Sequence, residues 1–141
     1  MAWYAAHIIL FFRLKKGTQK CFPIWENIVL IRAESEQEAF AKAEELGRQD
    51  AGDDEGSLRI DDKPAELVFA GIRKLVLCRD HDRRPTDGIE VSYTEMATRS
   101  EEAIHKLVAG EPVSVTIADI FPDQESMADA TDGWHLARRC S

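Results

Sequence analysis

The sequence has no hydrophobic run long enough to cross a membrane. Its longest apolar stretch, "MAWYAAHIILFF" at the N-terminus, holds about a dozen residues, whereas a membrane-spanning helix needs about 20. No basic residue precedes this stretch and no small-residue cleavage site follows it, which argues against a secretory signal. We therefore interpret the stretch as a buried strand and predict a cytoplasmic protein that has no membrane partner.

Cysteine is scarce as well. Cys21, Cys78 and Cys140 are the three cysteines among 141 residues, and no two of them have the CxxC spacing. This odd, scattered set argues against a disulfide framework and is typical of a reducing compartment. With 44% hydrophobic residues, the chain has enough apolar surface to form a core without disulfides or metal. We predict one domain over residues 1–118, followed by a polar tail over residues 119–141.

Catalytic and cofactor motifs are also missing. The sequence contains no nucleophile elbow, phosphate loop, dinucleotide-binding glycine pattern or HExxH motif. The acidic stretch "DAGDDEG" lacks the alternating acids of a calcium loop. These absences imply no cofactor and favour a protein that is not an enzyme.

Positive charge is in short supply overall: 18 Lys and Arg against 26 Asp and Glu give a net charge of −8. Residues 1–33 carry five bases and one acid (+4), residues 34–66 four bases and twelve acids (−8), and residues 67–141 nine bases and thirteen acids (−4). A net-acidic chain binds phosphate backbones poorly. The charge therefore disfavours a nucleic-acid partner, and favours a protein partner with a basic surface or self-association between the +4 and −8 regions.

What the sequence does contain is a first strand, Trp3–Leu14, that is apolar on both faces. A strand with this pattern is covered on both sides. Helices of the same chain can cover one side, and a second subunit is the simplest cover for the other. At period two the faces are Tyr4, Ala6, Ile8, Leu10, Phe12 and Leu14 on one side, and Trp3, Ala5, His7, Ile9, Phe11 and Arg13 on the other.

A capped helix follows the second strand, which we place at Phe22–Ala33. Ser35 and Glu38 have the spacing of a capping box, in which each side chain bonds a free backbone N–H near the helix start. We predict Phe40 as the main anchor of the helix on the sheet. Its apolar stripe comprises Ala39, Phe40, Ala43 and Leu46.

The later elements are shorter or less regular. Gly71 interrupts the third strand and indicates a bulge or a close approach. The predicted elements are a third strand at Leu67–Arg79, a half-exposed fourth strand at Ile89–Thr94, a second helix that starts at Thr98 or Ser100 and stops at Gly110, and a fifth strand at Val113–Ile117.

The resulting order, ββαββαβ, predicts an α+β fold: a mostly antiparallel sheet of four to five strands with two helices on one face. Without the first strand the order is the split βαβ pattern, so a ferredoxin-like elaboration is an alternative.

Four stretches resemble a known family: "WYAA" from Trp3, "WENIVLIRAESEQEAFAKAEELG" from Trp25, "FAGI" from Phe69 and "DGIEV" from Asp87. The family consists of small bacterial proteins and is catalogued only as a domain of unknown function, number forty-two eighty-eight. The resemblance covers about residues 3–95, and the strand-to-helix junction is its most specific part. It implies a bacterial α+β protein and implies no activity, so it assigns no functional residue.

Two titratable residues interrupt apolar strands. His7 titrates near neutral pH and could act as a base, or be a core or interface histidine with a satisfied hydrogen bond. Glu26 could act as an acid or base with a raised pKa, or pair with Arg13 or Arg32 across the hairpin. A partner or ligand site, if the chain has one, is expected at Trp3, His7, Trp25 and Glu26.

Two other polar stretches have simpler interpretations. "CRDHD", with Cys78, Asp80, His81 and Asp82, contains zinc-binding residue types, but no second ligand cluster has zinc-finger spacing, so a polar turn is favoured over a metal site. "KKGTQK" at residues 15–20 is basic but lacks the interleaved aromatics of RNA-binding surfaces. It is interpreted as a solvated turn.

The sequence therefore favours a non-enzymatic protein-interaction or regulatory module that acts as a homodimer. The alternative is a small-ligand binder or simple acid–base enzyme that uses His7 and Glu26. The alternative requires that these two side chains share a face, and the sequence does not determine strand register.

Overall fold

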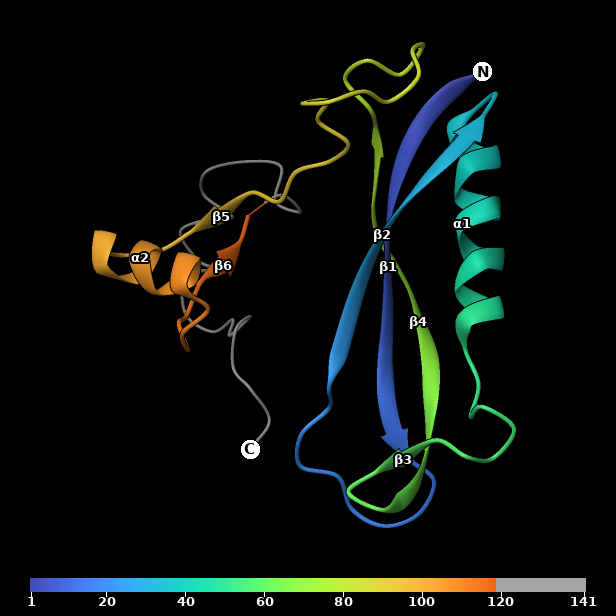
Figure 1. The fold of residues 1–141 in the computed structure, drawn as a ribbon, viewed down its shortest axis with the longest axis vertical. Coiled ribbons are helices and arrows are strands. Elements are labelled where there is room, and N and C mark those ends of the chain that lie inside the picture. Colours follow the sequence, from blue (N-terminus) through green and yellow to red (C-terminus); the bar gives the residue numbers. More distant parts are fainter. Residues whose placement is uncertain (119–141) are drawn as a thin grey trace. The chain divides into compact units, whose positions relative to one another are not determined.

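The computed structural model describes residues 1–118 (Figure 1). The chain divides into two compact units, one spanning Met1–Ser92 and the other beginning at Tyr93. The predicted polar tail, residues 119–141, lies outside the described residues. The elements in order are β1 Ala2–Leu14, β2 Ile24–Ala33, α1 Glu36–Asp50, β3 Arg59–Ile60, β4 Lys63–Leu77, β5 Met96–Ala97, α2 Glu101–Ala109 and β6 Thr116–Ile117.

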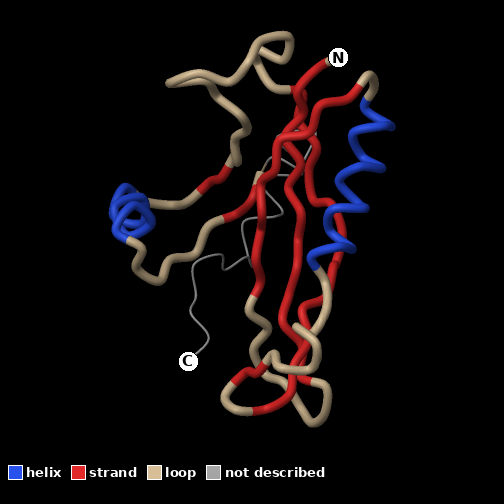
Figure 2. The backbone as a smooth tube through the Cα atoms, turned by 45° about the vertical axis from the view of Figure 1, so that its right-hand side comes forward, coloured by secondary structure: helices blue, strands red, loops and turns tan. Residues whose placement is uncertain are grey.

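The first unit is an antiparallel sheet with strand order β2-β1-β4-β3. Helix α1 runs along one face of this sheet (Figures 1 and 2). Strands β5 and β6 form a second, two-stranded antiparallel sheet in the other unit. The predicted α+β class is confirmed.

The core lies between α1 and the sheet. The fully buried β1 residues Ala6, Ile8 and Leu10 point to this side, and Ile31 and Ala33 of β2 join them. Burial of such aliphatic side chains stabilises the fold by roughly 1.5–3 kcal/mol each. β1 is buried on both faces along its middle, since Ala5 and His7 on the other face are also completely buried, and this matches its apolar pattern.

Ser35 caps α1 as the sequence predicts. Its Oγ accepts a hydrogen bond of 3.1 Å from the Glu38 N–H. The Glu38 carboxylate reaches back to the Glu34 N–H at 2.9 Å, one residue before the position that a capping box uses. That backbone hydrogen bond is the main reason why the pKa of Glu38 lies below its usual value.

The prediction that Phe40 anchors α1 is wrong. Phe40 is exposed, and the buried helix residues are Ala39, Ala43 and Gly47, at a spacing of four. These residues have little or no side chain, so the helix backbone approaches the sheet closely. A Cβ on Gly47 would stand 2.4 Å from the Phe69 ring, which shows how little space remains.

Strand β4 contains β-bulges on either side of Gly71, where the sequence predicts a bulge or a close approach. The pairing of β4 with β1 shifts twice, between His7 and Ile8 and between Ile9 and Leu10. Each shift inserts one extra residue into β4, because β4 counts one more residue than β1 at each point. Arg73 is the extra residue of the first bulge, and its side chain reaches the face of the sheet opposite α1.

The sequence analysis missed strand β3. It forms a hairpin with the start of β4 through a two-residue turn, Asp61 and Asp62, whose φ angles are 49° and 63°. Two consecutive positive φ values are typical of the type I′ turns that join antiparallel strands. Asn-Gly and Asp-Gly are the usual signals for this turn, and Asp-Asp is not among them.

The predicted fourth strand at Ile89–Thr94 is wrong, because no residue of that stretch lies in a strand. Helix α2 begins after Ser100, which caps it, and ends at Gly110 in the left-handed conformation. It belongs to the unit that contains β5 and β6, whereas the sequence analysis had placed it on the main sheet. Two of its large apolar residues, Ile104 and Val108, are exposed.

Candidate functional site

The side of the main sheet away from α1, which we call the distal face, holds a cluster of four polar residues. Strand register places Glu26 opposite Ile9 and His7 opposite Ile28, so Glu26 and His7 are diagonal neighbours on this face. The His7 Nδ1 atom lies 2.9 Å from Glu26 Oε1. Arg73 Nε and Nη2 donate to the two Glu26 oxygens at 2.6 and 3.0 Å. Ser92 Oγ contacts His7 Nε2.

The hydrogen bonds place a proton on Nδ1 of His7. An ionised carboxylate can only accept, so Nδ1 carries a proton and donates it to Glu26. The other ring nitrogen, Nε2, makes a hydrogen bond with the Ser92 hydroxyl. The Arg73 guanidinium lies 3.5 Å from Nδ1, but a protonated Nδ1 has no lone pair to accept from it. The cluster is therefore a chain from Ser92 through His7 to Glu26, with Arg73 at its end.

Opposing effects act on the Glu26 carboxyl. Partial burial raises its pKa, but the hydrogen bonds from Arg73 and His7 and their positive charge outweigh burial and hold the pKa below the usual value. Glu26 is thus ionised at neutral pH. The sequence predicts Arg13 or Arg32 as the ion-pair partner of Glu26. In the structure Arg13 pairs with Glu66, and the ion-pair partner of Glu26 is Arg73.

The chain itself covers part of the distal face through a return segment, residues 79–92. The segment is joined to the start of β1 by backbone hydrogen bonds, from the Trp3 N–H to the His81 carbonyl and from the Cys78 N–H to the Trp3 carbonyl. Cys78 Sγ also lies 3.3 Å from the Val91 carbonyl. Ala5 and His7 beside it are completely buried.

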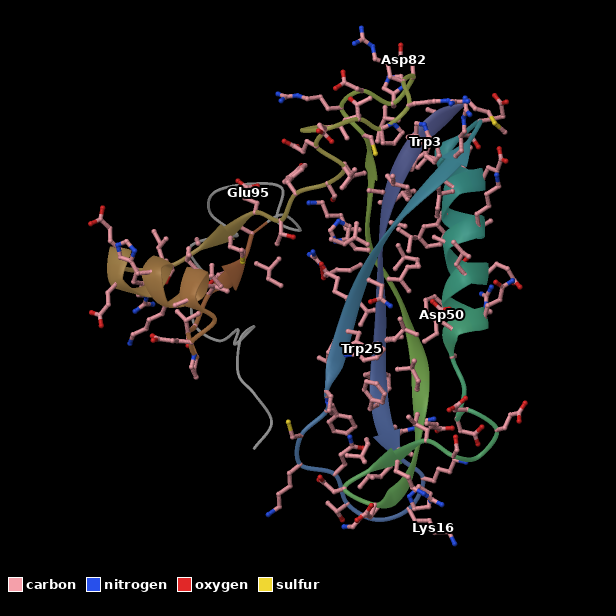
Figure 3. The ribbon with its side chains drawn as sticks, viewed as in Figure 1. Trp3, Lys16, Trp25, Asp50, Asp82 and Glu95 are labelled. Carbon is pink, nitrogen blue, oxygen red and sulfur yellow. The ribbon has the colours of Figure 1, made fainter. Side chains whose placement is uncertain are left out.

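Of the four predicted site residues, Trp3, His7 and Glu26 share the distal face, and Trp25 does not. Trp25 pairs with Leu10 in the register and lies on the α1 side, where its ring packs edge-on against Phe12 at 4.9 Å. Trp3 and Trp25 are also far apart along the sheet (Figure 3). Trp3 instead stacks under the Arg32 guanidinium at 5.6 Å. Including Trp25 in one site with His7 was wrong.

Apolar side chains surround the polar cluster and are open to solvent. On β2, every second residue belongs to the distal face, and the aliphatic ones are conspicuously exposed: Ile24 by 63%, Ile28 by 49% and Leu30 by 38%. Ile9 and Phe11 of the neighbouring β1 are partly exposed beside them. We refer to Ile24, Ile28 and Leu30 as the β2 row.

Comparison with known proteins agrees with this division of the chain. The domain of unknown function DUF4288 matches residues 3–92, which is the sheet, α1 and the return segment up to Ser92. The chain belongs to the DUF4288 family. No curated protein and no solved structure matches the chain. The DUF4288 region thus contains the whole polar cluster and the β2 row.

Arg73 and Ser92 were missed by the sequence analysis. Ser92 is 85 residues from its partner His7, and no local pattern predicts such a contact. Arg73 had a weak signal: it lies two residues after Gly71, so the expected bulge could have directed attention to the polar residue beside it.

Three further observations concern metal ligands, thiol chemistry and membrane-spanning helices in residues 1–118. No group of three or more His, Cys, Asp or Glu side chains there could hold a metal ion, and burial raises the pKa of the Cys78 thiol, which disfavours its thiolate form. No helix in this part of the chain is both long and apolar enough to cross a bilayer.

Proposed function

We propose that this protein is a non-enzymatic interaction or regulatory module that acts as a homodimer through the β2 row and its surroundings. The observation that carries the proposal is the exposure of three large aliphatic side chains in a line on one strand. Leaving apolar area in water costs roughly 25 cal/mol per Å², and contiguous exposed apolar surface is typical of a protein-binding site. We further propose a bacterial, cytoplasmic protein, in line with its family resemblance. The number of cysteines does not support this location, because Cys21 is disulfide-bonded.

The state of the polar cluster supports a structural role over catalysis. The His7 side chain is 0% exposed, and each ring nitrogen already has a hydrogen-bond partner. A base in this state has no free lone pair to take a proton from an external substrate. One of the three lysines of the basic turn is also engaged, because Lys15 forms an ion pair with Asp53, which reduces the charge available for nucleic-acid binding.

Replacement of Ile28 by lysine tests the proposal. We expect wild-type protein at micromolar concentration to have twice the 15.9 kDa mass of the chain by light scattering after size exclusion. Ile28→Lys places a charge in the middle of the β2 row and should shift the protein to monomer. Val108→Lys is the matched control, since it makes the same change at an exposed aliphatic residue of α2 and should leave the mass unchanged. A monomeric wild type contradicts the proposal.

A second candidate function has one specific observation in its favour. Ser92, His7 and Glu26 stand in the order nucleophile, base and orienting acid, which is the arrangement of a serine hydrolase. His7 and Glu26 also share a face, as an acid–base function of this pair requires. Against it, His7 is fully buried, and a shallow pocket next to the return segment, lined by Trp3, Leu30 and several residues between Cys78 and Val91, does not include His7, Glu26 or Ser92.

Ser92→Ala separates the two functions. We expect the substitution to lower the free energy of unfolding by about 1–3 kcal/mol, because it leaves His7 Nε2 buried without a partner. Urea unfolding of the two proteins measures this. We also expect a fluorophosphonate probe to leave the wild type unlabelled. Labelling of wild-type Ser92, absent from the variant, would instead establish the hydrolase function.

A further inference from the structure

Strand β2 is an edge strand with few of the features that usually protect an edge. It occupies one end of the strand order and pairs only with β1 among the strands of residues 1–118. Its pairing runs without a register shift from Ile24 to Ala33, and the strand itself contains no proline and no lysine. Proteins normally block long edges with bulges, lysine or proline, and here one lysine of α1, Lys42, donates to the Arg32 carbonyl at 2.8 Å. The rest of this regular edge of ten residues is suited to strand addition.

The outward backbone groups of β2 can be assigned from one hydrogen bond. The Phe12 N–H donates to the Pro23 carbonyl at 3.0 Å. Successive residues of a strand direct their N–H and C=O groups to opposite sides. The odd-numbered residues of β2 therefore bond β1, and the even-numbered residues point outward. These are Ile24, Glu26, Ile28, Leu30 and Arg32.

The other long edge of the sheet, the outer side of β4, is different. It carries two bulges, a glycine at position 71 with φ of 150°, and the adjacent basic residues Arg73 and Lys74. Bulges and charges of this kind discourage edge-to-edge pairing. The contrast singles out β2 as the edge that is open to another strand.

We propose that β2 pairs antiparallel with β2 of a second copy of this chain, about a two-fold axis at Val29. This inference rests on the proposed homodimer and specifies its contact. The two four-stranded sheets then join into one continuous sheet, with β2 of each copy at its centre. A two-fold contact of this kind is self-complementary, because each residue meets the same partner in both directions.

Charge complementarity selects the register. With Val29 on the axis, residues whose numbers sum to 58 face each other, so Glu26 lies opposite the partner's Arg32, and Ile28 opposite the partner's Leu30. An axis at Leu30 would instead place Glu26 opposite the partner's Glu34, and an axis at Ile28 would place it opposite the partner's Leu30. Opposite charges across a strand pair stabilise it, and like charges destabilise it.

Both charged groups can make this contact. Within residues 1–118 no carboxylate pairs with the Arg32 guanidinium, which lies over the Trp3 ring. The Arg32 carbonyl accepts from Lys42, and the lysine releases it where the new strand pairs at this residue. Glu26 accepts three hydrogen bonds, from His7 and Arg73, out of about four that a carboxylate can accept. On the α1 side, the bulky Trp25 falls opposite the partner's small Ala33.

Amide hydrogen exchange followed by NMR tests this pairing. In the proposed dimer the outward N–H groups of Glu26, Ile28, Leu30 and Arg32 exchange slowly at high protein concentration and quickly after dilution to monomer. The odd-numbered amides, bonded to β1, stay slow throughout. A dimer whose even-numbered amides exchange quickly would overturn the β2 pairing while leaving the homodimer intact. Slow even-numbered amides at every dilution would also overturn it, because a segment of the same chain would then cover the edge.

Arg32→Glu provides a second, independent measurement. It places two carboxylates opposite each other at both ends of the contact, and we expect the dimer dissociation constant to rise at least about tenfold. Arg59→Glu makes the same change in net charge on β3, at the other edge of the sheet, and should alter the constant by less than about twofold. Equal effects of the two variants would overturn the register.

Discussion

Arg73→Met is expected to destabilise the protein by about 2–3 kcal/mol at neutral pH, because it removes the main counter-charge of a partly buried carboxylate. The Arg73 side chain is 15% exposed and that of Glu26 29%. Methionine preserves much of the aliphatic length, so the loss comes chiefly from the charge. Urea unfolding monitored by tryptophan fluorescence gives the free energy of unfolding for both proteins.

The pH dependence of this effect has a defined sign. The folded-state pKa of Glu26 is depressed, so its contribution is present above its unfolded pKa, about 4.3, and is lost as pH falls through the folded pKa. The penalty of Arg73→Met should therefore shrink as pH drops below about 4. Arg13→Met is the matched control: its pair with Glu66 is more exposed, so the cost should stay under about 1 kcal/mol. Similar costs for both variants would contradict a structural polar cluster.

Gly47→Ala is expected to destabilise the protein by about 1–2 kcal/mol, although helix propensity alone predicts the opposite. Alanine in a helix interior is favoured over glycine by about 1 kcal/mol. The new methyl group, however, would stand 2.4 Å from the Phe69 ring, and overpacking of this kind typically costs about 1–3 kcal/mol. The sign of the change in urea unfolding thus decides whether α1 lies as close to β4 as described.

A double-mutant cycle isolates the contact. Phe69→Leu removes the ring atoms that the new methyl group would meet. In that background Gly47→Ala should be neutral or stabilising, since only its effect on helix propensity remains. A Gly47→Ala variant that is more stable than the wild type would show that the helix and the strand are further apart.

Much of the first unit could be predicted from local sequence. The two-sided apolar pattern of Trp3–Leu14 predicted a buried strand, and the Ser35 signal predicted the start of α1. The prediction of Phe40 as the anchor of α1 was wrong because an apolar stripe shows which side of a helix is hydrophobic and does not show how closely the helix approaches the sheet. Because α1 lies close to the sheet, the residues that contact the sheet are the small Ala39, Ala43 and Gly47, and the large Phe40 side chain is exposed.

The candidate site was only partly predictable. His7 and Glu26 were identifiable because a polar side chain in an apolar strand needs a hydrogen-bond partner. The β1–β2 register makes the two residues neighbours, and they form a hydrogen bond. Trp25 was assigned to the wrong face, since sequence alone leaves the pairing undetermined. The covering of His7 by Ser92 depends on a return segment with no regular strand, and such loops carry no period from which a contact could be inferred.

Isotope-filtered NMR on an equal mixture of labelled and unlabelled chains tests most directly whether β2, with the β2 row, is the self-association surface. We expect intermolecular contacts from the methyl groups of Ile28 and Leu30, and none from Ile104 or Val108 of α2. Intermolecular contacts that involve only residues outside β2, or a complete lack of them at millimolar concentration, would contradict the homodimeric module proposed for this protein.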